Sequence, residues 1–355
     1  MREEAKGTRR RGMSGDEIER ALASMRSILT ADDSSLRSVL CREILLAALA
    51  VEDDDLDILD LKVINRSMRE MRYAFKVFKP YRHIRKISIF GSARTPEDSP
   101  YYKMAVKFAR SLSRQGYMVI TGAADGIMKA GNEGAGTGKS FGVNIHLPFE
   151  QEANEYIVDD LKLVTFKYFF TRKLIFVMES HAIALFPGGF GTHDEGFEIL
   201  TLLQTGKASP RPFLLMELPG ETYWEKWDEF VQEQILARGF ISPEDASLYR
   251  IVHSPEAGVD EIRSFYSTYH SLRQVKDRLV MRLERELPSS AIAELNEKFG
   301  DLLAEGRIEK TDALPEEANE PELMEKPRIV FSYDHRSAAR LRILIDEINR
   351  MGKAK

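Results

Sequence analysis

The chain has 355 residues, of which 43% are hydrophobic and 30% are charged, and its formal net charge is −5. This composition is typical of a globular protein with one or two domains, and the acidic balance argues against a nucleic-acid-binding surface. Cys41 is the one cysteine, which excludes an internal disulfide and a cysteine-cluster metal site. The longest apolar run, residues 44–51, is too short to span a bilayer, and the first residues carry no signal-peptide core. We therefore expect a cytoplasmic protein with no membrane partner.

The first 80 residues predict a helical extension. Residues 1–14 are polar and basic, which is typical of a disordered tail. Ser14 and Glu17 have the spacing of a capping box that opens a helix. Apolar residues then recur at helical spacing over 36–51 and again over 56–78. Residues 1–80 carry no recognisable chemistry, so we expect them to pack on the main domain or on another subunit.

Beyond Lys86 the pattern changes to short apolar runs that alternate with amphipathic segments of ten or more residues. Such alternation predicts right-handed βαβ units, and hence an α/β, Rossmann-like, doubly wound parallel sheet. We assign residues 81–270 to this Rossmann-like domain. Ligands of such sheets bind beyond the carboxyl ends of the strands. The strands are expected at 87–90, 118–121, 141–145, 161–164, 182–186, 213–216 and 250–253.

After residue 269 the alternation stops, and residues 271–355 form a small C-terminal extension with helical and strand elements. The charged segment 271–286 predicts a helix, whereas the proline-rich and glutamate-rich segment 311–327 predicts a loop. A strand at 328–331 and a helix over 337–351 close the chain. The extension either joins the edge of the sheet or mediates subunit contacts, and the sequence leaves both open.

The strongest local signal is Pro-Gly-Gly-Phe-Gly-Thr at 187–192, which lies between a predicted strand and a predicted helix. Glycines let a ligand approach the backbone closely, and the first turn of a helix offers unpaired N–H groups and the positive end of its dipole. A tight connection between strand and helix is the simpler explanation. The combination of glycines with a helix N-terminus favours a phosphate site.

Two other turns follow predicted strands and are weaker signals. Gly91 and Ser92 end the first strand, and Gly122, Asp125 and Gly126 follow the second. Each turn can present backbone N–H groups to a nucleotide, and an ordinary turn is an equally good explanation for each. For Asp125 alone, helix capping is slightly favoured.

Two charged pairs near these turns are candidates for chemistry. Arg172 and Lys173 lie near the start of a predicted helix, where such a pair is usually a solvated face. Asp194 and Glu195 lie one turn after the glycines, where acidic residues often only complement the helix dipole. A carboxylate one turn from a bound phosphate would nevertheless lie near the sugar of a nucleotide. There it could stabilise the oxocarbenium-like sugar that forms when a glycosidic bond breaks. The seven histidines show no metal-ligand spacing.

The sequence from Pro187 to Glu195, Pro-Gly-Gly-x-Gly-Thr-x-x-Glu, resembles the signature of the Lonely Guy (LOG) family. The upstream pair Arg172-Lys173 is similar to the second motif of that family. These proteins are nucleotide 5′-monophosphate phosphoribohydrolases that were long labelled lysine decarboxylases. The similarity extends over roughly residues 85–255 and includes the 141–148 run.

The resemblance implies a Rossmann-like enzyme that uses neither a metal nor a redox cofactor and that forms a homodimer or a higher homo-oligomer. It would hydrolyse a purine nucleoside 5′-monophosphate, such as AMP or a cytokinin riboside monophosphate, to the free base and ribose 5-phosphate. Arg172 and Glu195 would correspond to the essential arginine and glutamate. The residues that would bind substrate or phosphate are Gly91, Ser92, Gly122, Asp125, Gly126, Lys173, Gly188, Gly189, Gly191 and Thr192.

Two departures from the family pattern bear on this hypothesis. The usual Gly-Gly-Gly-Pro-Gly after the second strand is Gly-Ala-Ala-Asp-Gly at 122–126, which could alter the fit of the substrate. His193 replaces a commoner leucine and leaves Glu195 in place. The alternative hypothesis is a non-catalytic nucleotide-binding sensor or carrier. A lysine decarboxylase is the least favoured interpretation, because no lysine lies in a recognisable pyridoxal phosphate context.

Overall fold

The computed structural model describes residues 13–30, 33–146 and 152–353. Compactness divides the chain into two units, Met1–Met68 and Arg69–Lys355. The predicted disordered tail lies almost wholly outside the described residues, as does the end of the 141–148 run. Within the described ranges, no helix combines the length and the apolar character that a membrane crossing needs. The three-part division of the chain at residues 80 and 270 stays a prediction.

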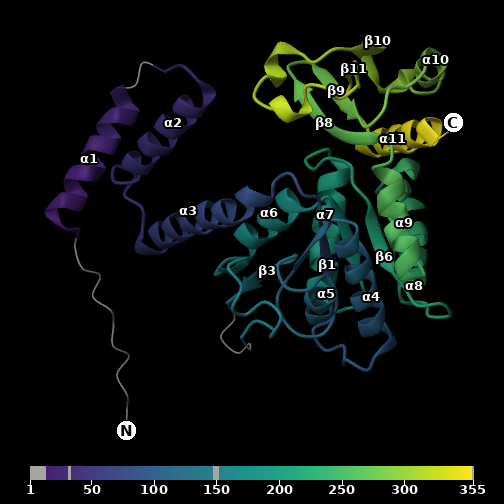
Figure 1. The fold of residues 1–355 in the computed structure, drawn as a ribbon, viewed down its shortest axis with the longest axis horizontal. Coiled ribbons are helices and arrows are strands. Elements are labelled where there is room, and N and C mark those ends of the chain that lie inside the picture. Colours follow the sequence, from purple (N-terminus) through teal and green to yellow (C-terminus); the bar gives the residue numbers. More distant parts are fainter. Residues whose placement is uncertain (1–12, 31–32, 147–151, 354–355) are drawn as a thin grey trace. The chain divides into compact units, whose positions relative to one another are not determined.

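The first unit is helical, as its sequence predicts, and is drawn in purple in Figure 1. The helix α1 (Gly15–Thr30) opens with the predicted capping box. Ser14 N donates to Glu17 Oε2 at 2.8 Å, and Glu17 N donates to Ser14 Oγ at 3.3 Å. The helix α2 (Leu36–Ala50) follows, and α3 (Ile58–Phe78) begins in this unit and ends in the next. Neither α1 nor α2 contains a buried residue.

The second unit is built on a seven-stranded sheet with the order β4-β3-β2-β1-β5-β6-β7 (Figure 1). Every neighbouring pair in it is parallel. The chain starts at β1 in the middle, moves outward to β4, returns beside β1 at β5 and moves outward on the other side. The predicted Rossmann-like, doubly wound fold is thereby confirmed. The strands are β1 (Lys86–Phe90), β2 (Met118–Thr121), β3 (Ser140–Ile145), β4 (Leu163–Phe166), β5 (Ala182–Leu185), β6 (Phe213–Met216) and β7 (Arg250–Val252).

Helices cover both faces of this sheet. One face packs against α4, α5 and α9, which bury Phe108, Ala130 and Ile262 among others. The opposite face packs against α6, α7, α8 and the end of α3. The bounds are α4 (Pro100–Arg114), α5 (Ile127–Ala135), α6 (Phe169–Glu179), α7 (Phe190–Gln204), α8 (Tyr223–Phe230), which continues as a π-helix (Val231–Leu236), and α9 (Pro255–Phe265). Short 3-10 turns lie at Lys79–Tyr81, Pro243–Leu248, Gly300–Leu302, Pro315–Glu317 and Pro321–Leu323.

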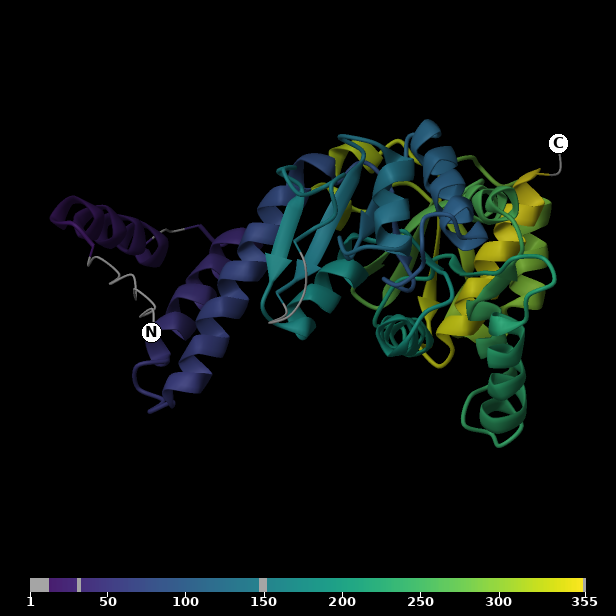
Figure 2. The same ribbon diagram turned by 90° about the horizontal axis from the view of Figure 1, so that it is seen from below.

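The C-terminal part of this unit is a four-stranded antiparallel sheet with the order β10-β11-β9-β8. The helix α11, yellow in Figures 1 and 2, lies beside α9, and Arg342 Nη2 contacts Glu261 Oε1 at 3.0 Å. This sheet packs its own core, separate from the core of the parallel sheet. The elements are β8 (Tyr269–Val275), β9 (Arg278–Leu283), α10 (Ser289–Lys298), β10 (Leu303–Thr311), β11 (Arg328–Tyr333) and α11 (Ala338–Lys353).

The predicted helix over 271–286 is wrong, because β8 and β9 form a hairpin there. Lys276 takes a left-handed conformation at the turn, with φ +54°. Leu279, Met281 and Leu283 alternate into the core with the period of a strand. Arg282, on the other face, is buried and contacts Glu317 at 2.7 Å. Arg282 is thus a charged residue on a buried face of the hairpin, whereas Lys276, Asp277 and Arg278 are exposed at and beside the turn. The strand expected at 161–164 is found two residues later, at β4.

The last turns of α3 belong to the core of the parallel sheet. The ring of Phe78 stacks on Phe141 of β3 with a centroid distance of 4.2 Å, and Tyr81 meets the same ring edge-on at 5.2 Å. Phe78 and Phe141 are fully buried. The C-terminal end of α3 is thus an integral layer of the second unit.

Replacing Phe78 tests this assignment. We expect Phe78→Ala to lower the free energy of unfolding by about 3–5 kcal/mol, because it empties a fully buried aromatic site. Urea denaturation measures the change. The matched control is Tyr73→Ala in the same helix, where the side chain is about half exposed. Equal losses for the two variants would show that the end of α3 does not pack as described.

Candidate active site

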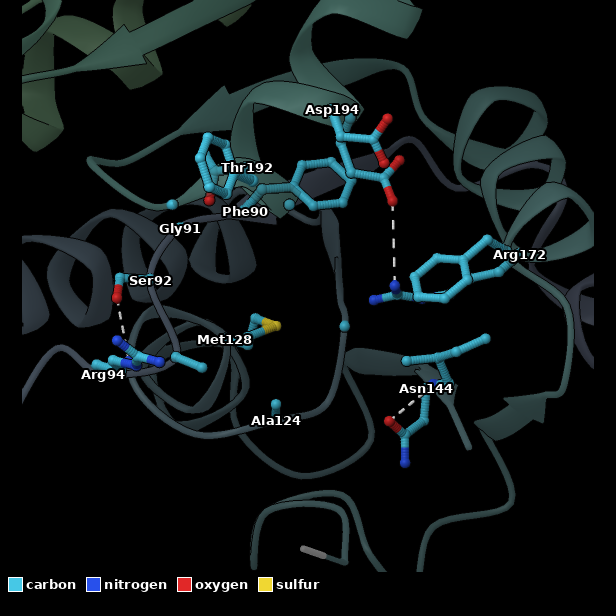
Figure 3. Close-up of a pocket in the computed structure, with 18 residues that line it drawn as sticks. Phe90, Gly91, Ser92, Arg94, Ala124, Met128, Asn144, Arg172, Thr192 and Asp194 are labelled. Carbon is cyan, nitrogen blue, oxygen red and sulfur yellow. Dashed lines mark hydrogen bonds and ion pairs between the residues drawn. The ribbon is translucent and has the colours of Figure 1, made fainter. Parts of the chain in front are cut away.

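A cavity of about 750 Å³ lies beyond the carboxyl ends of β1, β2, β3 and β5. The order of the sheet reverses between β1 and β5, and ligands of doubly wound folds bind at such a reversal. Figure 3 shows the side chains that surround the cavity. Its lining consists of Phe90, Gly91, Ser92, Ala93, Arg94, Gly122, Ala124, Met128, Asn144, Ile145, Phe169, Arg172, Gly189, Phe190, Gly191, Thr192, Asp194 and Glu195.

Most of the residues predicted from the sequence meet in this cavity. Those that line it are Gly91, Ser92, Gly122, Arg172, Gly189, Gly191, Thr192 and Glu195. The other predicted residues, Asp125, Gly126, Lys173 and Gly188, lie beside the lining residues in sequence and outside the lining. The Asp125 side chain is exposed. The N-cap position of α5 is Gly126, and this helix start has no side-chain capping hydrogen bond. The structure therefore gathers the two charged candidates and the glycine turn in one place.

The glycine turn connects β5 to α7, whose first residue is Phe190. A Cβ added to Gly188 would lie 2.1 Å from Thr192 Oγ1, so the packing of the turn itself requires glycine there. Gly189 and Gly191 differ, because a Cβ on either would meet no atom within 4 Å. Neither takes a positive φ. The fold alone therefore does not require glycine at these two positions, which line the cavity at the start of α7.

A partly buried chain of hydrogen bonds holds the turn on the side of α8. The Tyr223 hydroxyl of α8 donates to Gly188 O at 2.5 Å, and His193 Nε2 lies 2.7 Å from the same hydroxyl. Because the tyrosine proton is used on Gly188, His193 donates through Nε2. Burial lowers the pKa of His193, which favours the neutral ring. The histidine that replaces the commoner leucine thus helps to hold the Gly188 carbonyl away from the cavity.

Arg172 lies in the first turn of α6 and reaches across the cavity. Its Nε donates to Val143 O at 2.9 Å, and its guanidinium lies 5.2 Å from the Phe176 ring. A Cβ on Gly122 would meet Arg172 Nη2 at 2.6 Å, so a side chain at 122 would displace the arginine. Arg172 Nη1 lies 4.0 Å from Glu195 Oε1, the contact drawn as a dashed line beneath Asp194 in Figure 3.

Glu195 is buried, with 6% of its surface exposed. Burial raises its pKa to about 7, and the nearby charges of Arg172 and Lys173 counteract this only in part. Lys173 is held by Asp194 at 2.8 Å and by Glu198 at 2.6 Å. Glu195 therefore changes its protonation state near neutral pH, and carboxyl groups with such a shifted pKa are frequent at functional sites.

The turn after β2 has an unusual backbone at Ala123, which takes a φ of +66°. Left-handed conformations are unfavourable for alanine and easy for glycine, the commoner residue here in the family that the sequence resembles. Thr121 Oγ1 accepts a hydrogen bond from Ala123 N, and Asn154 donates to Ala123 O through N and Nδ2. Asn154 Nδ2 also contacts Asn132 Oδ1 at 3.0 Å. Hydrogen bonds thus hold the turn in the shape that glycine would adopt more readily.

Sequence reasoning missed several of the residues that line the cavity. Phe90, Met128 and Ile145 supply apolar walls, and Asn144 accepts a hydrogen bond from the N–H of its own neighbour. Phe90 directly precedes Gly91, and Met128 lies two residues after Gly126. Asn144 and Ile145 lie inside the 141–148 run, where only the alternation of strand faces could have singled them out. Phe190 is 96% exposed between two glycines, an exposed aromatic that could have been singled out. Among the described residues, no group of three or more His, Cys, Asp or Glu side chains is placed to hold a metal ion.

Residues 120–262 match the model of a protein family described as "Possible lysine decarboxylase". This central segment of the chain is therefore similar to the members of that family. The family resemblance predicted from the glycine turn, Arg172 and Glu195 is thereby confirmed. The matched segment runs from β2 to α9, so it contains the glycine turn and both charged candidates.

Solved structures of similar shape cover about half of the chain. The X-ray structure of TM1055 is 21% identical, covers 51% of this chain and 99% of its own, and has a TM-score of 0.36. A molybdenum cofactor binding protein from Rippkaea orientalis is 19% identical, with 51% and 96% covered and a TM-score of 0.37. The molybdenum cofactor carrier protein of Chlamydomonas reinhardtii is 20% identical, with the same coverage and a TM-score of 0.37. No curated protein sequence gives a significant match.

The buried carboxyl predicts a pH-dependent stability. Because the pKa of Glu195 is higher in the fold than in the unfolded chain, the folded state binds more protons between about pH 4.5 and 7. Wild-type stability therefore falls through this range and levels off above it. Glu195→Gln removes the titrating group. We therefore expect its free energy of unfolding to exceed that of wild type by an amount that grows with pH to on the order of 3 kcal/mol at pH 8. Chemical denaturation at several pH values measures this, and a constant difference between the two proteins would contradict it.

Proposed function

We propose that this protein hydrolyses the N-glycosidic bond of a purine nucleoside 5′-monophosphate, such as AMP or a prenylated AMP. The products are the free base and ribose 5-phosphate, and no cofactor takes part. The observation that carries the proposal is the position of Glu195, a buried carboxyl one turn along the helix whose glycine-lined start faces the same cavity. The single cysteine fits a reducing compartment, and we propose the cytoplasm.

The phosphate binds at the start of α7. Gly189 and Gly191 leave room for phosphate oxygens to approach the backbone, and the amides of the first turn and the helix dipole favour a dianion there. Thr192 adds a hydroxyl at the same end. The phosphate is remote from the reacting bond at C1′, and its binding energy positions the ribose that carries that bond.

The ribose then lies beside Glu195. As the bond from C1′ to the base nitrogen breaks, positive charge develops on the sugar, and the ionised carboxylate stabilises that charge. Glu195 also orients the water whose oxygen forms the new bond to C1′, while the departing base gains a proton. Arg172 fixes the ribose or the base, and Met128, Ile145 and Phe169 offer apolar surface to a planar base.

Incubation with AMP tests the proposal, with adenine and ribose 5-phosphate measured by chromatography. We expect equal amounts of both products, a kcat/KM that rises through about pH 7 as Glu195 ionises, and no turnover by Glu195→Gln. Gly191→Ala should lower kcat/KM about 10- to 100-fold, because the methyl group obstructs one charge-assisted contact to the phosphate. It should leave the unfolding free energy unchanged or slightly higher, since nothing in the fold opposes it.

The matched control is Gly300→Ala, another glycine whose added Cβ meets nothing within 4 Å and which does not line the cavity. Normal kinetics in Gly191→Ala would contradict phosphate binding at this turn. Absence of hydrolysis of AMP, GMP, CMP and prenylated AMP would contradict the enzyme. Tight nucleotide binding without hydrolysis, unaffected by Glu195→Gln, would instead favour a sensor or carrier.

We further propose that the protein forms a homodimer through α6. Phe170, Leu174 and Met178 repeat every four residues along this helix, and each is 40–55% exposed. Such a stripe is a candidate for burial against a second copy. Analytical ultracentrifugation at micromolar concentration should give twice the chain mass, and Leu174→Asp should shift the protein to the monomer. A wild-type monomer at this concentration would contradict the proposal.

A further inference from the structure

Glu70 of α3 is a buried carboxylate that the proposed chemistry does not use. It is 5% exposed and is not among the residues that line the cavity. Its Oε1 accepts a hydrogen bond from Lys167 N at 2.8 Å, and its Oε2 accepts one from Thr171 Oγ1 at 2.7 Å. Both partners lie about a hundred residues later in the chain. A buried carboxylate that makes such remote contacts needs a structural reason, because burial of its charge is costly.

The two partners of Glu70 bracket the start of α6. That helix begins at Phe169, and its N-cap residue, Tyr168, makes no capping hydrogen bond through its side chain. The first turn of a helix has unpaired N–H groups and a positive dipole end, which a carboxylate stabilises. Glu70 therefore supplies from α3 the anionic group that the local sequence of α6 lacks.

The turn that Glu70 holds carries Arg172. Arg172 directly follows Thr171, and its N donates to Tyr168 O at 3.3 Å, so its backbone is part of this first turn. Its side chain then reaches Val143 O and approaches Glu195 to 4.0 Å. Phe169, at the start of the same turn, lines the cavity. Any displacement of this turn moves the guanidinium relative to the bound ribose or base.

We propose that Glu70 is a positioning residue, which acts through the first turn of α6 to place Arg172 in the cavity. The inference rests on the proposed function, because its kinetic test measures the hydrolysis of AMP. The phosphate site is on α7, which Glu70 does not hold. Loss of Glu70 should therefore disturb the contacts of Arg172 with the base and ribose and leave phosphate binding unchanged.

Steady-state kinetics with AMP, together with inhibition by ribose 5-phosphate, separate these effects. We expect Glu70→Ala to lower kcat/KM at least tenfold, mainly through kcat, because a displacement of about 1 Å is enough for such a loss. The inhibition constant of ribose 5-phosphate should stay within about twofold of wild type. In an Arg172→Lys background, Glu70→Ala should cost much less than it does alone, since the two changes act on one group.

A conservative variant rescues the position if the inference is right. In Glu70→Gln, the amide oxygen can accept from Lys167 N and the amide nitrogen can donate to Thr171 Oγ1. The threonine proton then turns to Tyr168 O, which already lies 3.0 Å away. We expect this variant to keep kcat within about threefold of wild type.

The matched control is Ser99→Ala, which removes the N-cap of α4, where Ser99 Oγ accepts from Tyr101 N at 3.2 Å. It should lower the melting temperature comparably to Glu70→Ala and leave kcat unchanged. Kinetics of Glu70→Ala that match those of Ser99→Ala, or an equal weakening of ribose 5-phosphate binding, would overturn the inference.

If the wild-type protein hydrolyses no nucleotide, the proposed function fails and Glu70 is judged separately. Amide hydrogen exchange over residues 167–173 and the affinity for AMP then provide the readout. Glu70→Ala should speed exchange in this segment at least tenfold, whereas Ser99→Ala should not. Unchanged exchange there would overturn the inference on its own.

Discussion

The guanidinium of Arg172 is the point on which the cavity depends, because distant parts of the chain converge there. It bonds the Val143 carbonyl at the end of β3 and lies against the bare α-carbon of Gly122 after β2. It also faces Glu195 on α7. Each of these neighbours restricts one direction of movement, and the reversal of strand order between β1 and β5 is what brings them together. The sheet thus sets the position of the arginine more than local sequence does.

Glu195 shows the energetic consequence of this arrangement. Two cations stand near it, and burial nevertheless outweighs them and raises its pKa. The fold therefore keeps an ionisable group where ionisation is unfavourable, and the rest of the domain compensates with two apolar layers on the sheet. If Glu195 acts as proposed, the site gives up stability for reactivity, a relation that is common between reactive groups and the folds that hold them.

The sequence predicts the parallel sheet well, because buried strands and amphipathic helices alternate with clear periods. The glycine turn is also visible in the sequence because its pattern is local, whereas Arg172 is singled out by the family resemblance and not by a local pattern. The hairpin of β8 and β9 was hidden because Arg282 is buried against Glu317, a pairing that no local pattern reveals. The contact of Glu70 with the start of α6 was hidden because its partners lie about a hundred residues away. Polar contacts between residues far apart in the chain are therefore the features of this fold that could not be predicted from the sequence.

The empty space around Gly189 and Gly191 has an evolutionary consequence. Since a Cβ at either position would meet no neighbouring atom, a descendant that lost its ligand would be free to accumulate alanine there without harm to folding. Gly188, which Thr192 crowds, would persist in such a descendant. Comparing drift at these neighbouring glycines would therefore separate lineages that still bind an anion from those that merely inherited the scaffold.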